Sequence, residues 1–148
     1  MFNKILVVCM GNVCRSPMGE GVLKKLLPNK QVRSAGLVTD KSGLANCKAA
    51  PISILVAKEH DIDIQAHRAT QVTAEMCNQA DLILVMEQSH IERLTRISPT
   101  SRSKTLLFGQ WSGDGTIDDP YQKDQQAFLL AFQRIQNAAE AWARRLEA

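Results

Sequence analysis

A cysteine, an arginine and a serine stand close together near the start of the chain, in the stretch CMGNVCRS. Five residues separate Cys9 from Arg15, and Ser16 follows directly. A thiolate is a strong nucleophile, and a planar guanidinium matches two oxygens of a phosphate or arsenate better than lysine does. Gly11 and Asn12 tolerate the left-handed backbone of a tightly wrapped loop. The stretch therefore predicts a nucleophilic cysteine inside an anion-binding loop.

The place of this loop in the chain supports the same chemistry. It lies between the apolar run of residues 5–9 and a segment with helical periodicity, so backbone N–H groups and a helix N-terminus would surround a bound anion. These groups and Arg15 also favour the thiolate form of Cys9. We expect the sulfur to attack a bound phosphorus in line while the loop amides and Arg15 hold its equatorial oxygens.

Cleavage of a phosphate ester also needs a proton donor for the departing group, and TIDDPYQ offers two carboxyls on a loop. Asp118 and Asp119 stand directly before Pro120, in a region with three glycines and no periodicity between residues 109 and 120. The alternative is that the two aspartates only cap the last helix through Pro120. The two roles can coexist.

The elements that must position these residues follow from the hydrophobic pattern. Strands are expected at residues 5–9, 32–35, 82–86 and 105–108, and helices after the cap pair Ser16-Pro17, from Pro51, over residues 89–97, and along the stripe from Phe128 to Leu146. Alternating strands and helices predict an α/β fold, a three-layer α/β/α sandwich around a four-stranded parallel sheet. Such folds bind ligands at the carboxyl ends of their strands, where the CMGNVCRS stretch lies.

Length and composition limit the number of domains and the possible function classes. The 148 residues are enough for one domain, expected over residues 1–148, and the net charge of +3 is too small to indicate nucleic acid binding. No apolar run is long enough to span a membrane, so the expected location is the cytoplasm, and we expect a monomer. The four cysteines form no CxxC pair, which argues against a metal site and a disulfide framework.

The local sequence CMGNVCRSP closely resembles the active-site loop of the low-molecular-weight protein tyrosine phosphatases. The resemblance continues along almost the whole chain, through Ser34-Ala35-Gly36, His67-Arg68, ADLILVMEQSH and DDPY. It implies hydrolysis of phosphotyrosine through a phosphocysteine intermediate, without a cofactor or metal. The aspartate before proline, Asp119, would be the general acid and would later activate the attacking water, while Ser16 would ease departure of the Cys9 sulfur.

The resemblance also implies supporting roles, each of which could instead belong to an ordinary cap, turn or surface residue. Phosphate would be held by the backbone of Met10, Gly11, Asn12, Val13 and Cys14 together with Arg15. Asn12 would stabilise the loop with help from Ser34, and Glu20, His67 and Glu87 would form a polar network beneath the pocket. Cys14 is expected to guard Cys9 through a reversible disulfide, or to act as a small buried hydrophobe. Cys47 and Cys77 are expected to be structural.

On the substrate side, Tyr121 is expected to form one wall of an aromatic slot. The next position is Gln122, where many eukaryotic relatives carry a second aromatic residue, and residues 37–46 contain none. In this respect the chain resembles the bacterial exopolysaccharide-associated branch, whose implied partner is a membrane tyrosine autokinase that governs capsule or exopolysaccharide export.

Two rival functions remain. A thiol-dependent arsenate reductase would share the cysteine loop, but it needs two closely spaced further cysteines, whereas Cys77 stands alone and Cys47 is distant in sequence. A catalytically inactive phosphotyrosine-binding module would be expected to lack the nucleophile or the acid.

Overall fold

Four parallel strands form one sheet in the order β2-β1-β3-β4 in the computed structural model, which describes residues 2–147. The strands are β1 (Lys4–Cys9), β2 (Gln31–Gly36), β3 (Leu82–Val85) and β4 (Thr105–Leu107). All three pairings are parallel. The predicted four-stranded parallel sheet is confirmed, with each strand within one or two residues of its expected bounds.

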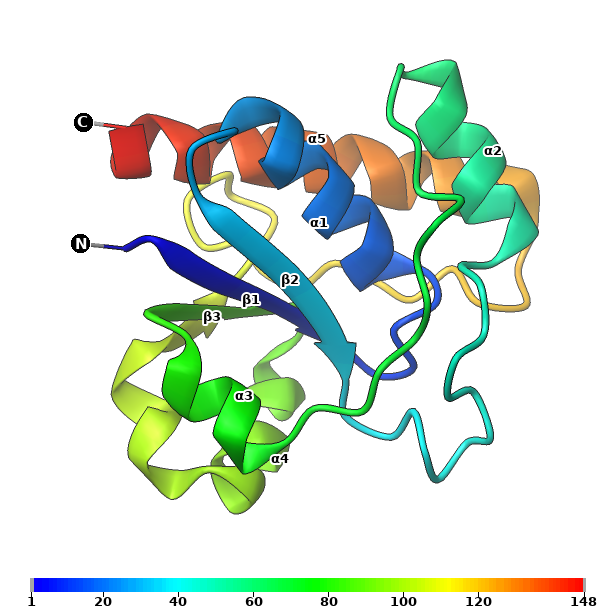
Figure 1. Ribbon diagram of the computed structural model, residues 1–148. Coiled ribbons are helices and arrows are strands. Elements are labelled where there is room, and N and C mark those ends of the chain that lie inside the picture. The colour runs from blue at the N-terminus through cyan, green and yellow to red at the C-terminus, as the bar shows by residue number, and fades with distance from the viewer. Residues whose placement is uncertain (1, 148) are drawn as a thin grey trace.

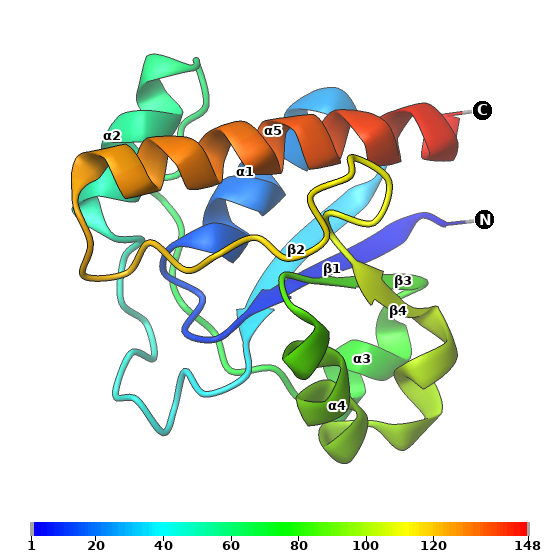
Figure 2. The same ribbon diagram turned by 180° about the vertical axis from the view of Figure 1, so that it is seen from behind.

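Helices cover both faces of the sheet, as Figures 1 and 2 show. One face carries α1 (Arg15–Leu26), α2 (Pro51–Glu59) and α5 (Gln125–Glu147), and the other carries α3 (Ala74–Gln79), α4 (Gln88–Ile97) and the 3-10 helix η1 (Pro99–Lys104). Strand β1 serves both cores, because Ile5 and Val7 pack towards α1 and α5 while Leu6 and Val8 pack towards α3 and α4. The predicted three-layer architecture is confirmed.

The strand order reverses beside β1, and the functional residues gather at that point. From β1 the chain passes to β2 on one side and then to β3 on the other, which opens a crevice at the carboxyl ends of β1 and β3. The CMGNVCRS stretch leaves β1 there, Glu87 follows β3, and the loop to α5 follows β4. Gly36, the last residue of β2, is required here, since a Cβ would lie 2.8 Å from the Met10 carbonyl oxygen.

Two local expectations are corrected. Helix α1 begins at Arg15, its N-cap position is Cys14 and no side chain caps it, so the Ser16-Pro17 cap is wrong. The Ser16 hydroxyl is instead engaged by Cys9 and Asn12. The six-residue helix α3 was missed because it is too short to show a period, although Thr73 caps it.

The start of the last helix is also resolved. Helix α5 begins at Gln125, and the Asp124 carboxylate accepts from the Ala127 N–H at 3.0 Å. Asp124, and not Asp118 or Asp119, therefore occupies the capping position.

Among residues 2–147, no helix has the length and apolar character needed to cross a membrane.

Candidate active site

The loop of residues 9–15, called the cysteine loop below, forms the floor of a cavity of about 320 Å³. Its lining includes the loop residues Cys9, Met10, Gly11, Val13, Cys14 and Arg15, together with Val38, Ser42, Leu44, Asp119 and Tyr121. The cavity is therefore assembled from segments that follow β1, β2 and β4. Four of the predicted phosphate-binding positions line it directly, besides Cys9 and Arg15.

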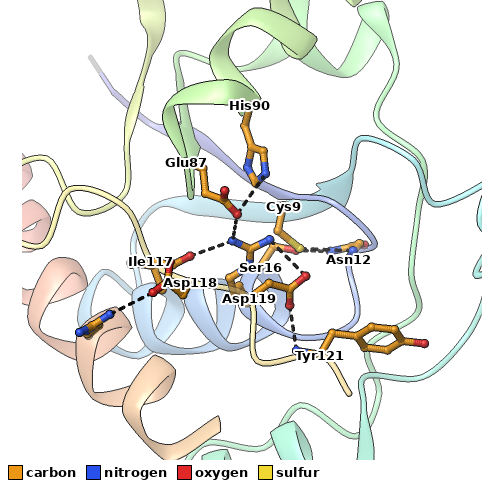
Figure 3. A network of polar contacts seen from close by, with 11 residues as sticks. Cys9, Asn12, Ser16, Glu87, His90, Ile117, Asp118, Asp119 and Tyr121 are labelled. Atoms are coloured by element: carbon orange, nitrogen blue, oxygen red, sulfur yellow. Dashed lines mark hydrogen bonds and ion pairs between the residues drawn. The ribbon is translucent and has the colours of Figure 1, made fainter. Parts of the chain in front are cut away.

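Cys9 lies at the bottom of this cavity and is almost fully buried. Its Sγ is 2.9 Å from the Ser16 Oγ, and the Asn12 N–H donates to it at 3.3 Å (Figure 3). Hydrogen bonds of this kind stabilise a thiolate relative to a thiol. The predicted pairing of Cys9 with Ser16 is present.

Asn12 is the centre of the hydrogen bonds that hold the cysteine loop. It adopts a left-handed backbone with φ 64°, as the sequence predicted. Its side-chain amide donates to Ser16 Oγ at 2.7 Å and to Ser34 Oγ at 3.0 Å, while its Oδ1 accepts from the Thr70 N–H at 2.9 Å. The Ser34 hydroxyl in turn donates to Glu20. One buried side chain thus connects the nucleophile to β2 and α1.

His67 and Glu20 complete this group from outside. The His67 Nε2 lies 2.7 Å from the Asn12 carbonyl oxygen, and Glu20 also accepts from Lys24 at 2.6 Å. The structure therefore brings Asn12, Ser34, Glu20 and His67 together beneath the loop.

Arg15 is held from the opposite side of the cavity. Its guanidinium is 1% exposed and donates to Glu87 at 2.6 Å and to the Ile117 carbonyl oxygen at 2.8 Å (Figure 3). A second terminal nitrogen lies 3.5 Å from the Asp119 Oδ2, and the buried Nε has no partner among the described residues. Because a buried unpaired donor is costly, the free Nε beside the cysteine loop indicates a site for an anion.

Glu87 belongs to a different group from the one expected. It contacts Arg15 and His90 rather than Glu20 or His67, so the predicted single network is in fact two. His90 was not predicted. Its Nε2 lies 3.6 Å from Glu87, and burial together with the positive charge of Arg15 lowers the pKa of His90 from 6.5 to about 4. His90 is therefore neutral at pH 7.

Cys14, near the end of the cysteine loop, is a buried thiol that lines the cavity, and both it and Cys9 are free in this structure. Burial and the neighbouring Cys9 raise the pKa of Cys14 to about 12, so Cys14 carries its proton at pH 7. Two cysteines five positions apart are thus placed in unlike environments. The expected guard disulfide stays a prediction.

The loop of residues 109–124, called the aspartate loop below, brings one of its two candidate acids to the cavity. Asp119 lines the cavity and its Oδ1 accepts from the Tyr121 N–H at 3.0 Å. The Asp118 side chain is 77% exposed and lies 3.8 Å from Arg134 of α5, directed away from Cys9 (Figure 3). Tyr121 is half exposed and forms part of the cavity wall.

Thr39 was also missed by the sequence analysis. It is fully buried, and its hydroxyl donates to the Gly11 carbonyl oxygen at 2.9 Å. A polar residue a few positions after the SAG motif was the available signal, but nothing local distinguishes it from a turn residue.

Within residues 2–147, no three His, Cys, Asp or Glu side chains are grouped so that they could hold a metal ion.

Comparison with known proteins agrees with this arrangement. The family model described as low molecular weight phosphotyrosine protein phosphatase matches residues 4–148. The chain belongs to this family. It is therefore a protein tyrosine phosphatase, and the family expected from CMGNVCRSP is confirmed.

Named relatives match over nearly their full length. The chain is 47% identical to the probable low molecular weight protein-tyrosine-phosphatase AmsI of Erwinia amylovora, covering 99% of both chains. It is 45% identical to the phosphatase Wzb of Salmonella typhi, covering 100% of this chain and 97% of the relative. Among solved structures, Vibrio vulnificus Wzb in complex with benzylphosphonate is 54% identical, with a TM-score of 0.96 and coverage of 98% and 99%.

Proposed function

We propose that this phosphatase hydrolyses phosphotyrosine in proteins through a phosphocysteine intermediate formed on Cys9. The observation that carries the proposal is the pairing, in one cavity, of a buried cysteine with a buried guanidinium whose Nε is unpaired. A phosphate placed above Cys9 gives that nitrogen an acceptor. The exposed ends of Leu44 and Tyr121 then provide apolar surface for a ring, and the benzylphosphonate bound by the Vibrio vulnificus relative likewise joins a ring to a phosphonate.

In the first half-reaction, the Cys9 sulfur attacks phosphorus and the bond to the tyrosine oxygen breaks. Asp119 donates a proton to that oxygen, while Arg15 and the loop N–H groups stabilise the equatorial oxygens. Before substrate binds, Arg15 lies 3.5 Å from Asp119.

In the second half-reaction, Asp119 takes a proton from a water molecule that attacks the phosphocysteine. The sulfur–phosphorus bond breaks, inorganic phosphate leaves and Cys9 returns as a thiolate. The Ser16 hydroxyl, 2.9 Å from the sulfur, stabilises the departing thiolate by a hydrogen bond. Glu87, which His90 contacts, and the Ile117 carbonyl oxygen hold the guanidinium, and Asn12 with Ser34 holds the loop in position.

The proposed protein substrate is a membrane tyrosine autokinase of capsule or exopolysaccharide export. Support comes from the similarity to AmsI and Wzb and from the absence of a second aromatic residue at Gln122. Purified protein should release phosphate from the phosphorylated tail of such a kinase. If it hydrolysed small aryl phosphates but not that tail, this substrate would be wrong while the chemistry would stand.

One assay separates the phosphatase from its rivals. Wild type, Cys9→Ser and Asp119→Ala are tested on p-nitrophenyl phosphate and a phosphotyrosine peptide without added metal, and on arsenate with thioredoxin. We expect turnover of both phosphate esters by wild type, loss of turnover in Cys9→Ser, and a fall of about a hundredfold or more in Asp119→Ala. Arsenate reduction would support the reductase, for which the buried Cys77 is poorly placed. Full activity of Cys9→Ser would end the proposal.

A further inference from the structure

A second cavity opens beside the active-site cavity, at the N-terminal end of α2. It has a volume of about 580 Å³ and shares Val13, Leu44 and Tyr121 with the active-site cavity. Its remaining lining runs from Cys47 to Pro51 and includes Ile54 and Gln65. We call these residues, with the three shared ones, the α2 groove. The two cavities are therefore neighbours that adjoin at Val13, Leu44 and Tyr121.

We infer that the α2 groove binds an apolar side chain of the substrate polypeptide that lies one or two residues from the phosphotyrosine. This inference rests on the proposed function, because it assigns the part of the substrate that surrounds the reacting residue.

The shape of the active site leads to this occupant. Cys9, Arg15, Leu44 and Tyr121 line the same cavity, so a phosphotyrosine with its phosphate above Cys9 and Arg15 places its ring beside Leu44 and Tyr121. The α2 groove begins at the same two side chains. An extended chain advances about 3.3 Å per residue, so a neighbouring side chain reaches the groove within one or two residues.

The chemistry of the groove selects an apolar side chain. Ile54, Pro51 and Ala50 line it, and Lys48 is its only charged residue among the described residues. Ile54 is only partly buried although it packs on the core, so its remaining surface faces the groove's solvent-filled volume. Burying a leucine-sized side chain on such a surface is favourable roughly in proportion to the apolar area removed from water.

The groove is also formed before substrate arrives. The Ala50 N–H donates to the Val13 carbonyl oxygen at 2.8 Å, which fixes the start of α2 to the cysteine loop. The Ala69 N–H donates to the Cys47 carbonyl oxygen at 2.8 Å and ties the rim to the following segment. A preformed groove costs little ordering on binding, so the contact contributes to affinity.

The first test uses the wild-type enzyme and a series of short phosphotyrosine peptides. Leucine or serine is placed at one of the two positions before or after the phosphotyrosine, with glycine elsewhere. We expect leucine at one of these positions to raise kcat/KM about tenfold over serine, mainly through KM. Equal kcat/KM for the leucine and serine peptides at all four positions would overturn the inference. Failure to hydrolyse p-nitrophenyl phosphate would instead overturn the proposed function.

The second test compares two neighbouring residues of α2. Ile54 lines the groove, whereas Leu55 is 46% exposed and lies outside it. In Ile54→Ser the preference for leucine should fall to about twofold, while Leu55→Ser should keep it, and both variants should hydrolyse p-nitrophenyl phosphate like wild type. An unchanged preference in a folded Ile54→Ser protein, checked by thermal unfolding, would overturn the assignment. Self-association lost in Ile54→Ser would identify a second copy of the chain as the occupant, and would also overturn it.

Discussion

The cysteine loop and the aspartate loop meet at one cavity but are built in opposite ways. The cysteine loop is buried, and Asn12 alone connects it to Ser16, Ser34 and Thr70. Most of the second half of the aspartate loop is exposed. The Asp119 carboxylate accepts one hydrogen bond, from a backbone N–H two residues away, and lies 3.5 Å from Arg15. The nucleophile is therefore fixed by a buried network, whereas the acid is held by one local hydrogen bond and one longer ion pair.

The two halves of the aspartate loop also differ in how firmly they are held. Its first half is anchored, because Trp111 packs edge-on against Trp142 of α5 with ring centres 5.9 Å apart, and Ile117 is fully buried. The Ile117 carbonyl oxygen accepts from Arg15, so the two loops meet at this residue. Residues after Ile117 are held less firmly, since Asp118 and Asp119 are fixed to distant residues only by ion pairs of 3.8 and 3.5 Å, which places the proposed acid on the less constrained part of the loop. The fold thus combines a rigid anion site with a proton donor that can adjust to the substrate.

The largest effect is expected from Arg15→Lys in the rigid part. A lysine keeps the positive charge, but its single ammonium group cannot donate to Glu87, the Ile117 carbonyl oxygen and a phosphate at the same time. We therefore expect kcat/KM to fall about a thousandfold. Steady-state kinetics with p-nitrophenyl phosphate measures this, and inhibition by inorganic phosphate should weaken in parallel. Near wild-type kinetics would show that Arg15 does not bind the reacting phosphate.

Asp119→Asn should give the next largest effect and should separate activity from stability. Turnover of a phosphotyrosine peptide should fall about a hundredfold, whereas Tm should stay within error of wild type because the side chain is exposed. Asp118→Asn is the matched control, since Asp118 faces Arg134, and it should lose less than about twofold. Equal losses in the two variants would contradict the choice of Asp119.

Two residues with the same unusual backbone allow the loops to be compared directly. Asn12 has φ 64° in the cysteine loop and Gln122 has φ 63° in the aspartate loop. Asn12→Ala should lower the free energy of unfolding by about 3 kcal/mol, since it leaves buried partners unsatisfied. Gln122→Ala should change it by less than about 0.5 kcal/mol. Urea unfolding measures both, and similar losses would show that the two loops are equally constrained.

The smallest effect concerns pH. The pKa of His90 is lowered to about 4 in the folded chain by burial and by Arg15, so between pH 6.5 and 4 the unfolded chain binds more protons at this residue. Stability should therefore fall as pH drops through that window, by on the order of 1 kcal/mol per unit from His90. His90→Gln should make the decline shallower in urea unfolding between pH 4.5 and 7. An unchanged slope would contradict the buried neutral histidine.

Much of the fold was predictable from the sequence because the strands are buried on both faces. Residues 82–86 are continuously apolar, and α5 shows a clear stripe, so both follow directly from hydrophobic pattern. The start of α1 did not, because Ser16 looks like a cap but is engaged by Cys9, a contact that only the wrapped loop creates. Helix α3 was hidden by its length.

The residues of the site also differ in how far the sequence alone predicts them. Residues inside one short motif, such as Cys9 and Arg15, are recognisable because their spacing alone suggests the chemistry. Thr39 is not, since it contacts the loop only after distant segments come together. His90 is not either, since it lies beside Glu87 and is linked to Arg15 only through that carboxylate. We expected Glu87 near the loop, but in the same network as Glu20 and His67. The sequence indicates at which edge of the sheet Glu87 lies, but not that its side chain pairs with Arg15.

The most direct test of the account is to find where phosphate is carried during turnover. Wild-type enzyme turning over a phosphotyrosine peptide is quenched within milliseconds and digested, and the peptides are analysed by mass spectrometry. The account predicts one phosphoryl group, located on Cys9, and none in Cys9→Ala under the same conditions, because alanine has no atom that could accept it. A phosphoryl group on another residue, or turnover with no phosphorylated enzyme at any quench time, would contradict the phosphocysteine mechanism.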